Sequence, residues 1–307
     1  MALVIDRELL IGHHVFVSSD NEFQAEARLR QALWSERRGL KIGEHRGRPL
    51  GSRLAMPYAK DTLANYVTDA IRDVVRAEVL DPKKAEGKLY REPRIFDDLL
   101  SSQPLCFNLF GELQRDLDLA SRVFAGLLED ASIRVTGIEF EHSPGRGDQR
   151  FTADYSAFDV FVAYTSATAT RGFVGIEVKY AESLGGAPAR HRPRYDEVAE
   201  AMGVFLPEAR QRLRKLPLEQ FWRDHLLAAS LLLHGGSGFE AGSFVVIYPE
   251  GNTVVGKAVA DYRACLRDGS TFRTWTLESV LDAAEAAGAG AWVVEVRERY
   301  VGMEIDG

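Results

Sequence analysis

The segment at residues 172–180, GFVGIEVKY, places one glutamate and one lysine inside what otherwise reads as a buried strand. Side chains two residues apart in a strand point to the same face, so Glu177 and Lys179 share a face. Charges in such a strand are costly unless they are paired or bound to a metal ion. The segment therefore restricts the chain to folds in which a buried sheet carries a polar site.

The segments around this strand predict an α/β fold with a mixed sheet flanked by helices. A helical stretch at 99–128 precedes strands at 132–142, 157–164 and 172–180, helices at 194–216 and 218–233, and a strand at 243–249. The second and third strands are close enough to form a hairpin, whereas the fourth returns after helices and adds in parallel. The apolar phase of the first strand changes at Gly137, which indicates a bulge.

The N-terminal part reads as a separate helical region. Residues 1–98 are expected to form a helical extension packed on a core of residues 99–307, and residues 41–53 read as a polar, basic loop. Beyond 249 the pattern predicts a helix at 254–266, a strand at 271–276 and helices at 278–287 and 292–300. These elements would be a C-terminal α/β elaboration of the core.

Composition excludes several classes of protein. The 307 residues carry a net charge of −7, which argues against a uniformly basic nucleic-acid coat protein. The two cysteines form no C-x-x-C pair, and no glycine-rich loop with lysine and serine or threonine predicts a nucleotide-triphosphate site. No signal peptide is visible and no apolar run reaches the roughly 18 residues of a membrane span. We therefore expect a cytoplasmic protein with no membrane contact.

The chemistry of the site follows from a second carboxylate. Asp159 begins the strand that precedes GIEVK, and that strand is otherwise apolar, so a hairpin would bring Asp159 near Glu177 and Lys179. Magnesium prefers oxygen ligands, typically one or two carboxylates with waters and phosphate oxygens. A lysine beside it can orient a water or stabilise developing negative charge. This set predicts hydrolysis of a phosphodiester bond.

Two other interpretations stay open on the residues alone. An acidic residue, any residue and lysine also occur at 81–83 and 86–88, in a polar loop where they are solvated charges. Glu177 and Lys179 could likewise be a plain ion pair on a half-exposed strand. A further alternative is a non-catalytic nucleic-acid-binding or assembly module that keeps the same fold.

Asp159 in SAFDVFV and Glu177-Val-Lys179 in GIEVKY resemble the motif of the PD-(D/E)xK nuclease superfamily, the fold of many restriction endonucleases. The residue before Asp159 is Phe158 rather than the proline of the family name. The resemblance implies a helix-strand-strand-strand-helix-strand core and a magnesium-dependent nuclease, with Mn²⁺ able to substitute. It implies catalytic roles for Asp159, Glu177 and Lys179.

The resemblance also implies an additional metal ligand on the first core helix. Glu112 in FNLFGEL fits best, while Asn108 on the same helix and Glu141 in FEHSPGR are competing candidates. Fragments between about 100 and 235 are similar to a prokaryotic restriction-endonuclease-like group. That similarity implies a nucleic-acid substrate, with DNA favoured, and a homodimer would suit cleavage of both strands.

Substrate contacts are expected from two places. Gln220 and Arg223 lie three residues apart and share a helix face, where they could meet a phosphate or a site carboxylate. Arg190, Arg192 and Arg194 follow the site strand and could contact the nucleic-acid backbone without reading sequence. Each group could instead be part of an ordinary solvated surface.

Overall fold

The computed structural model describes residues 6–185 and 189–302, and the chain forms two compact units. The first unit consists of Met1–Glu112, Tyr180–Glu182 and Ala289–Gly307, and the second of Leu113–Lys179 and Ser183–Gly288. The units are thus interleaved along the chain. The domain boundary expected between residues 98 and 99 stays a prediction.

The first unit is mainly helical, as the spacing of apolar residues between 20 and 80 indicates. Its elements are α1 (Arg7–Gly12), α2 (Glu22–Arg37), β1 (Ile42–His45), β2 (Arg48–Leu54), α3 (Tyr58–Thr62), α4 (Asp69–Val75), the π-helix η1 (Arg76–Leu80), α5 (Pro82–Ala85), α6 (Arg94–Asp97), the larger part of α7 (Ser102–Arg115) and α14 (Trp292–Tyr300). A capping box at Asn21 and Gln24 fixes the start of α2.

The prediction of a polar loop at residues 41–53 is wrong, because these residues form the antiparallel hairpin of β1 and β2. Arg46 and Gly47 connect the strands, and both have a positive φ, 53° and 73°. Two-residue turns of this kind match the twist of paired strands. The hairpin is polar because most side chains of β1 are exposed, so the stretch lacks the apolar alternation by which strands are recognised.

The last helix of the chain packs on α2 inside the first unit. Arg299 in α14 is fully buried, and its guanidinium donates to Gln31 Oε1 at 2.8 Å and to the Asn65 carbonyl at 2.6 Å. It also lies 3.9 Å from the ring centre of Trp34. These contacts compensate a buried charge, and they join the two ends of the chain into one core.

The second unit is built around a five-stranded sheet with the order β3-β4-β5-β6-β7. Its elements are α8 (Leu117–Leu128), β3 (Arg134–His142), β4 (Phe158–Thr165), β5 (Arg171–Val178), α9 (Pro193–Met202), the 3₁₀ helix η2 (Pro207–Ala209), α10 (Arg210–Leu213), α11 (Glu219–Leu233), β6 (Ala241–Tyr248), α12 (Thr253–Arg263), β7 (Phe272–Thr276) and α13 (Leu277–Ala286).

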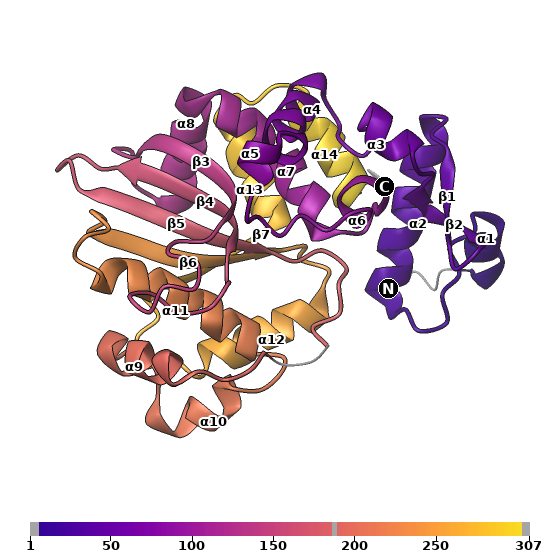
Figure 1. Ribbon diagram of the computed structural model, residues 1–307. Coiled ribbons are helices and arrows are strands. Elements are labelled where there is room, and N and C mark those ends of the chain that lie inside the picture. Colours follow the sequence, from indigo (N-terminus) through magenta and orange to yellow (C-terminus); the bar gives the residue numbers. More distant parts are fainter. Residues whose placement is uncertain (1–5, 186–188, 303–307) are drawn as a thin grey trace. The chain divides into compact units, whose positions relative to one another are not determined.

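This sheet confirms the predicted fold class, an α/β restriction-endonuclease-like core. β4 and β5 form the expected antiparallel hairpin, and β6 adds to β5 in parallel. The register of β3 on β4 shifts between Val135 and Gly137, which confirms the predicted bulge. Within this unit α9, α11 and α12 cover one face of the sheet, and α8 and α13 cover the other (Figure 1).

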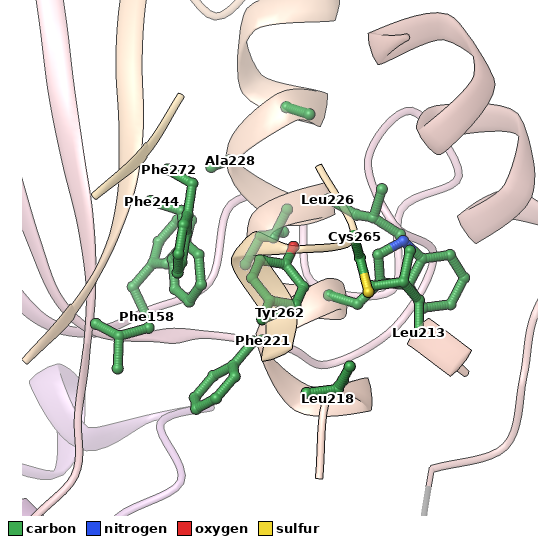
Figure 2. Packing of buried hydrophobic residues seen from close by; sticks show 14 of the residues in the cluster. Phe158, Leu213, Leu218, Phe221, Leu226, Ala228, Phe244, Tyr262, Cys265 and Phe272 are labelled. Atoms are coloured by element: carbon green, nitrogen blue, oxygen red, sulfur yellow. The ribbon is translucent and has the colours of Figure 1, made fainter. Parts of the chain in front are cut away.

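A cluster rich in aromatic side chains holds α11 against its face of the sheet. Phe244 of β6, Phe272 of β7 and Phe221 of α11 are at most 3% exposed, and they pack with Tyr262 of α12 (Figure 2). Burying side chains of this size contributes about 1.5–3 kcal/mol each. The cluster therefore fixes the axis of α11 and the positions of the polar residues in its first turns.

No helix in the described part of the chain is long and apolar enough to cross a membrane.

His225 of α11 lies inside the same cluster and is fully buried. Its Nδ1 lies 2.9 Å from the Tyr262 hydroxyl and its Nε2 lies 2.9 Å from Thr271 Oγ1. Burial disfavours the imidazolium and lowers the pKa of His225 to about 3. The ring is therefore neutral in the folded protein at neutral pH.

This lowered pKa predicts an acid-sensitive fold. A depressed pKa in the folded state contributes stability that is present above the unfolded pKa of about 6.5 and is lost as pH falls towards 3. His225→Asn removes this proton linkage, so its free energy of unfolding should fall less steeply between pH 6.5 and 4 than that of the parent, by up to about 1.4 kcal/mol per pH unit. Denaturant titrations at several pH values measure the two slopes, and equal slopes would contradict the assignment.

Candidate active site

The first carboxylates of the site lie where β4 begins and β5 ends. Val160 pairs with Ile176, so Asp159 and Glu177 stand one residue beyond this pair on neighbouring strands. The Val178 amide donates to Asp159 Oδ2 at 2.8 Å, which fixes the aspartate against the end of β5. The structure thus brings together the two carboxylates that the sequence analysis selected.

Lys179 and Glu177 form one hydrogen-bonded group with Gln220 from the first turn of α11. Lys179 Nζ lies 2.7 Å from Glu177 Oε1 and donates to Gln220 Oε1 at 2.9 Å. Gln220 Nε2 donates to Glu177 Oε1 at 2.6 Å. The amide of Gln220 therefore bridges both charged groups and fixes their orientation.

The ion pair of Glu177 and Lys179 is buried rather than half-exposed. The side chain of Glu177 is 7% exposed and that of Lys179 is 12% exposed. Removing two charges from water costs free energy that their attraction often only offsets, so a buried pair is weak evidence for a role in stability. Its contribution to stability therefore does not by itself account for the pair.

The electrostatic environment of Asp159 is dominated by burial and by other carboxylates. Burial raises the pKa of Asp159 well above its usual range, and the neighbouring charges of Glu177 and Glu141 raise it further. Lys179 and the Val178 amide act in the opposite direction. Negative charge therefore exceeds positive charge around Asp159, and a bound cation would relieve the excess.

Glu141, one of the candidates that the sequence left open, is among these charges. On β3, Phe140 pairs with Val160 and His142 pairs with Phe158, so Glu141 lies across from Asp159. Its φ is 48°, in the left-handed region that residues with a side chain seldom adopt. Such strain occurs often at functional sites.

Glu112 and Asn108 lie on the part of α7 that belongs to the first unit. Glu112 Oε1 accepts a 2.6 Å hydrogen bond from Thr68 Oγ1. Asn108 is fully buried, and its amide bonds to Val67, Asn65 and the Tyr300 hydroxyl. Asn108 therefore has a structural role in the first unit, while Glu112 as a metal ligand stays a prediction.

Arg223 bonds to protein groups beside the site rather than to the site carboxylates themselves. It lies 2.6 Å from Glu219 Oε1 and 3.5 Å from Asp154 Oδ2, and it donates to Ser156 Oγ at 3.1 Å. These partners tie α11 to the loop between β3 and β4. The described contacts of Arg223 indicate that this residue positions the loop.

The three arginines after the site strand differ in their surroundings. Arg194 donates to the Phe151 carbonyl at 2.8 Å and pairs with Glu197 at 2.9 Å. Arg190 and Arg192 are exposed and, together with Arg194, line an open groove of about 600 Å³. Arg190 and Arg192 are thus the better placed of the three to meet a large ligand.

Sequence reasoning missed Asp224, a buried carboxylate on α11. It follows Gln220 by one helical turn and is 3% exposed. Glu177 and Lys179 both act on its charge. The spacing of four residues from Gln220 was the available signal, but DHLLAASLLL reads as an amphipathic helix in which an aspartate is unremarkable.

The donor set fits a hard divalent cation. Within residues 6–185 and 189–302, no three side chains of His, Cys, Asp or Glu already form a cage that could hold a metal ion. Magnesium does not need such a cage, because it keeps several waters and uses one or two carboxylates together with substrate phosphates. Asp159 and Glu177 supply these carboxylates in a region of excess negative charge.

A family model described as the PD-(D/E)XK nuclease superfamily matches residues 18–302 of the chain. The match covers both units and includes each residue discussed above. The chain has no significant match among the curated proteins or among the solved structures.

The environment of Asp159 predicts that the site is a source of instability when no metal is bound. A raised pKa in the folded state contributes stability that is complete below the unfolded pKa of about 4 and is lost as pH rises through the folded pKa. In chelator, Asp159→Asn should therefore be more stable than the parent at pH 7, and the difference should vanish below pH 4. Denaturant titrations at both pH values measure this.

Asp148→Asn is the matched control for this experiment. Arg150 lowers the pKa of Asp148 by a hydrogen bond, which is the opposite shift. Its replacement should give no stabilisation at pH 7. If Asp159→Asn is also no more stable than the parent at pH 7, the carboxylate is not destabilising and the electrostatic description of the site is wrong.

Proposed function

The chain belongs to the PD-(D/E)XK nuclease superfamily, and on that premise we propose that it is a metal-dependent nuclease that hydrolyses phosphodiester bonds. The finer part of the proposal is a DNA endonuclease of restriction-endonuclease type, with Mg²⁺ as its ion and Mn²⁺ able to replace it. One observation carries the proposal. Asp159, Glu177 and Lys179 come together at the ends of two paired strands in a chain that the family model covers.

Asp159 and Glu177 would hold the metal ion. Glu177 is buried and Asp159 is half-buried, and both are fixed by donors, from Gln220 and from the Val178 amide respectively. When bound, the ion supplies neutralisation of phosphate charge and a lower pKa for water. The fixed donors reduce the freedom of the carboxylates, so little reorganisation is needed when a charged ligand arrives.

Lys179 would act on the reacting phosphate or on the attacking water. Its ammonium is held by Glu177 and Gln220, so its position is defined before substrate binds. Here it can stabilise negative charge that develops on phosphate oxygens, or orient the water by a hydrogen bond. Gln220 bonds to both the lysine and the glutamate and would position them, and contact of Gln220 with the substrate is a further part of the proposal.

The nucleic-acid backbone would run near the basic segment that follows the site strand. Arg190 and Arg192 are exposed, and cationic side chains of this kind supply affinity through phosphates without reading sequence. Arg194 and Arg223 would support this surface indirectly, because their described partners belong to the loop between β3 and β4. Glu112 as an additional ligand and a homodimer that cuts both strands are further parts of the proposal.

The direct test is cleavage of supercoiled, linear and single-stranded DNA, and of RNA, in Mg²⁺ or Mn²⁺. We expect cleavage by the parent that chelator abolishes. Lys179→Ala should lose about 10²–10³-fold in rate, because it removes a preorganised charge from the reacting centre. Lys257→Ala, which removes an exposed lysine of α12, should cleave like the parent.

Two outcomes would contradict the proposal. If the parent leaves every substrate intact in both metals, the chain is not a nuclease under the conditions that the family requires. If Lys179→Ala cleaves as fast as Lys257→Ala, the activity does not arise from this site. Metal-independent, salt-sensitive binding of DNA with no cleavage would favour a binding module.

A further inference from the structure

Asp224 is a buried acidic group of this region that the proposed mechanism does not use. It lies in α11 one turn after Gln220, so the two side chains project from the same side of the helix. Gln220 contacts Glu177 and Lys179, which directs this side of α11 towards the end of β5. Asp224 therefore lies on the side of α11 that faces the end of β5, one helical turn further along the helix than Gln220.

One oxygen of this carboxylate has no partner. Asp224 Oδ2 is buried and accepts no hydrogen bond from any described residue. An unsatisfied polar atom costs about 1–3 kcal/mol when buried, and more when it is charged, so native proteins usually provide a donor. For the ionised carboxylate, water or a ligand would supply this donor.

The charges around Asp224 indicate which ligand this is. Burial raises the pKa of Asp224 well above its usual range, and the charges of Glu177 and Asp154 raise it further, whereas Arg223 and Lys179 lower it. Arg223 already faces the carboxylates of Asp154 and Glu219. Glu141 and Glu177 act on Asp159, and Glu177 also acts on Asp224, while Lys179 is the ammonium that acts on both. Acidic groups are therefore in excess here, and a divalent cation would relieve that excess.

We infer that Asp224 is a positioning residue for the divalent cation, holding through Oδ2 a water of the hydrated ion whose direct ligands are Asp159 and Glu177. The inference rests on the proposed function. Magnesium and manganese keep several waters in protein sites, and each bound water is a hydrogen-bond donor that a buried carboxylate can accept. Mutation of a residue that contacts a metal's ligands rather than the metal itself typically changes metal affinity by about 10–100-fold.

The test is binding of Mn²⁺ alone, without nucleic acid, to the full chain by titration calorimetry. Asp224→Asn keeps the shape of the side chain and removes the charge, so its dissociation constant for Mn²⁺ should rise by about 10–100-fold. Asp97→Asn is the matched control, because Asp97 is similarly buried but pairs with Arg53 in the first unit. Its dissociation constant should stay within about twofold of the parent value.

Thermal unfolding in chelator separates this role from a structural one. If the charge of Asp224 is uncompensated without metal, Asp224→Asn should unfold at the same temperature as the parent or higher, and Mn²⁺ should stabilise it less. A lower unfolding temperature in chelator, or failure to fold, would overturn the inference by giving Asp224 a structural role.

The calorimetric outcomes also separate this inference from the proposed function. Equal Mn²⁺ affinity for Asp224→Asn and the parent would overturn the role of Asp224 and leave the nuclease proposal standing. A parent that binds no Mn²⁺ would overturn both.

Discussion

The pairing of β4 with β5 is the constraint on which the site depends. Hydrogen bonds between these strands run up to Val160 and Ile176, and the Val178 amide then bonds to the side chain of Asp159 instead of to a main-chain carbonyl. A shift of the register by one residue would turn every side chain of the strand to the other face. The aromatic cluster beneath α11 adds the second constraint, because it brings Gln220 to the same strand end.

Much of this arrangement could be predicted from the sequence because it is local. The hairpin of β4 and β5, the parallel return of β6 and the bulge at Gly137 follow from alternation, short connections and a change of apolar phase. Asp159 and Glu177 could be selected because each interrupts an apolar strand. The same reasoning failed for β1 and β2, since an exposed polar hairpin has no buried face to mark it.

The rest of the site depends on tertiary contacts that no local pattern encodes. Asp224 is one acidic residue in an amphipathic helix, and only the packing of α11 on the sheet shows that it is buried near Glu177 and Lys179. The arginines illustrate the converse. Arg194 and Arg223 could be selected as candidate substrate contacts from the sequence, whereas their bonds to carbonyls and carboxylates of the same unit are visible only in the structure. Their contact with substrate stays a prediction.

The interleaving of the two units has a consequence for synthesis on the ribosome. Residues 113–288, which include all of the second unit, emerge before the first unit has all of its parts. Helix α2 cannot complete its packing until α14 has been synthesised, because Gln31 and the Asn65 carbonyl accept hydrogen bonds from Arg299. Although domains often fold in the order of their synthesis, here the N-terminal segment is expected to finish last. Until Arg299 is synthesised, Gln31 and the Asn65 carbonyl lack the guanidinium that they accept from in the folded unit.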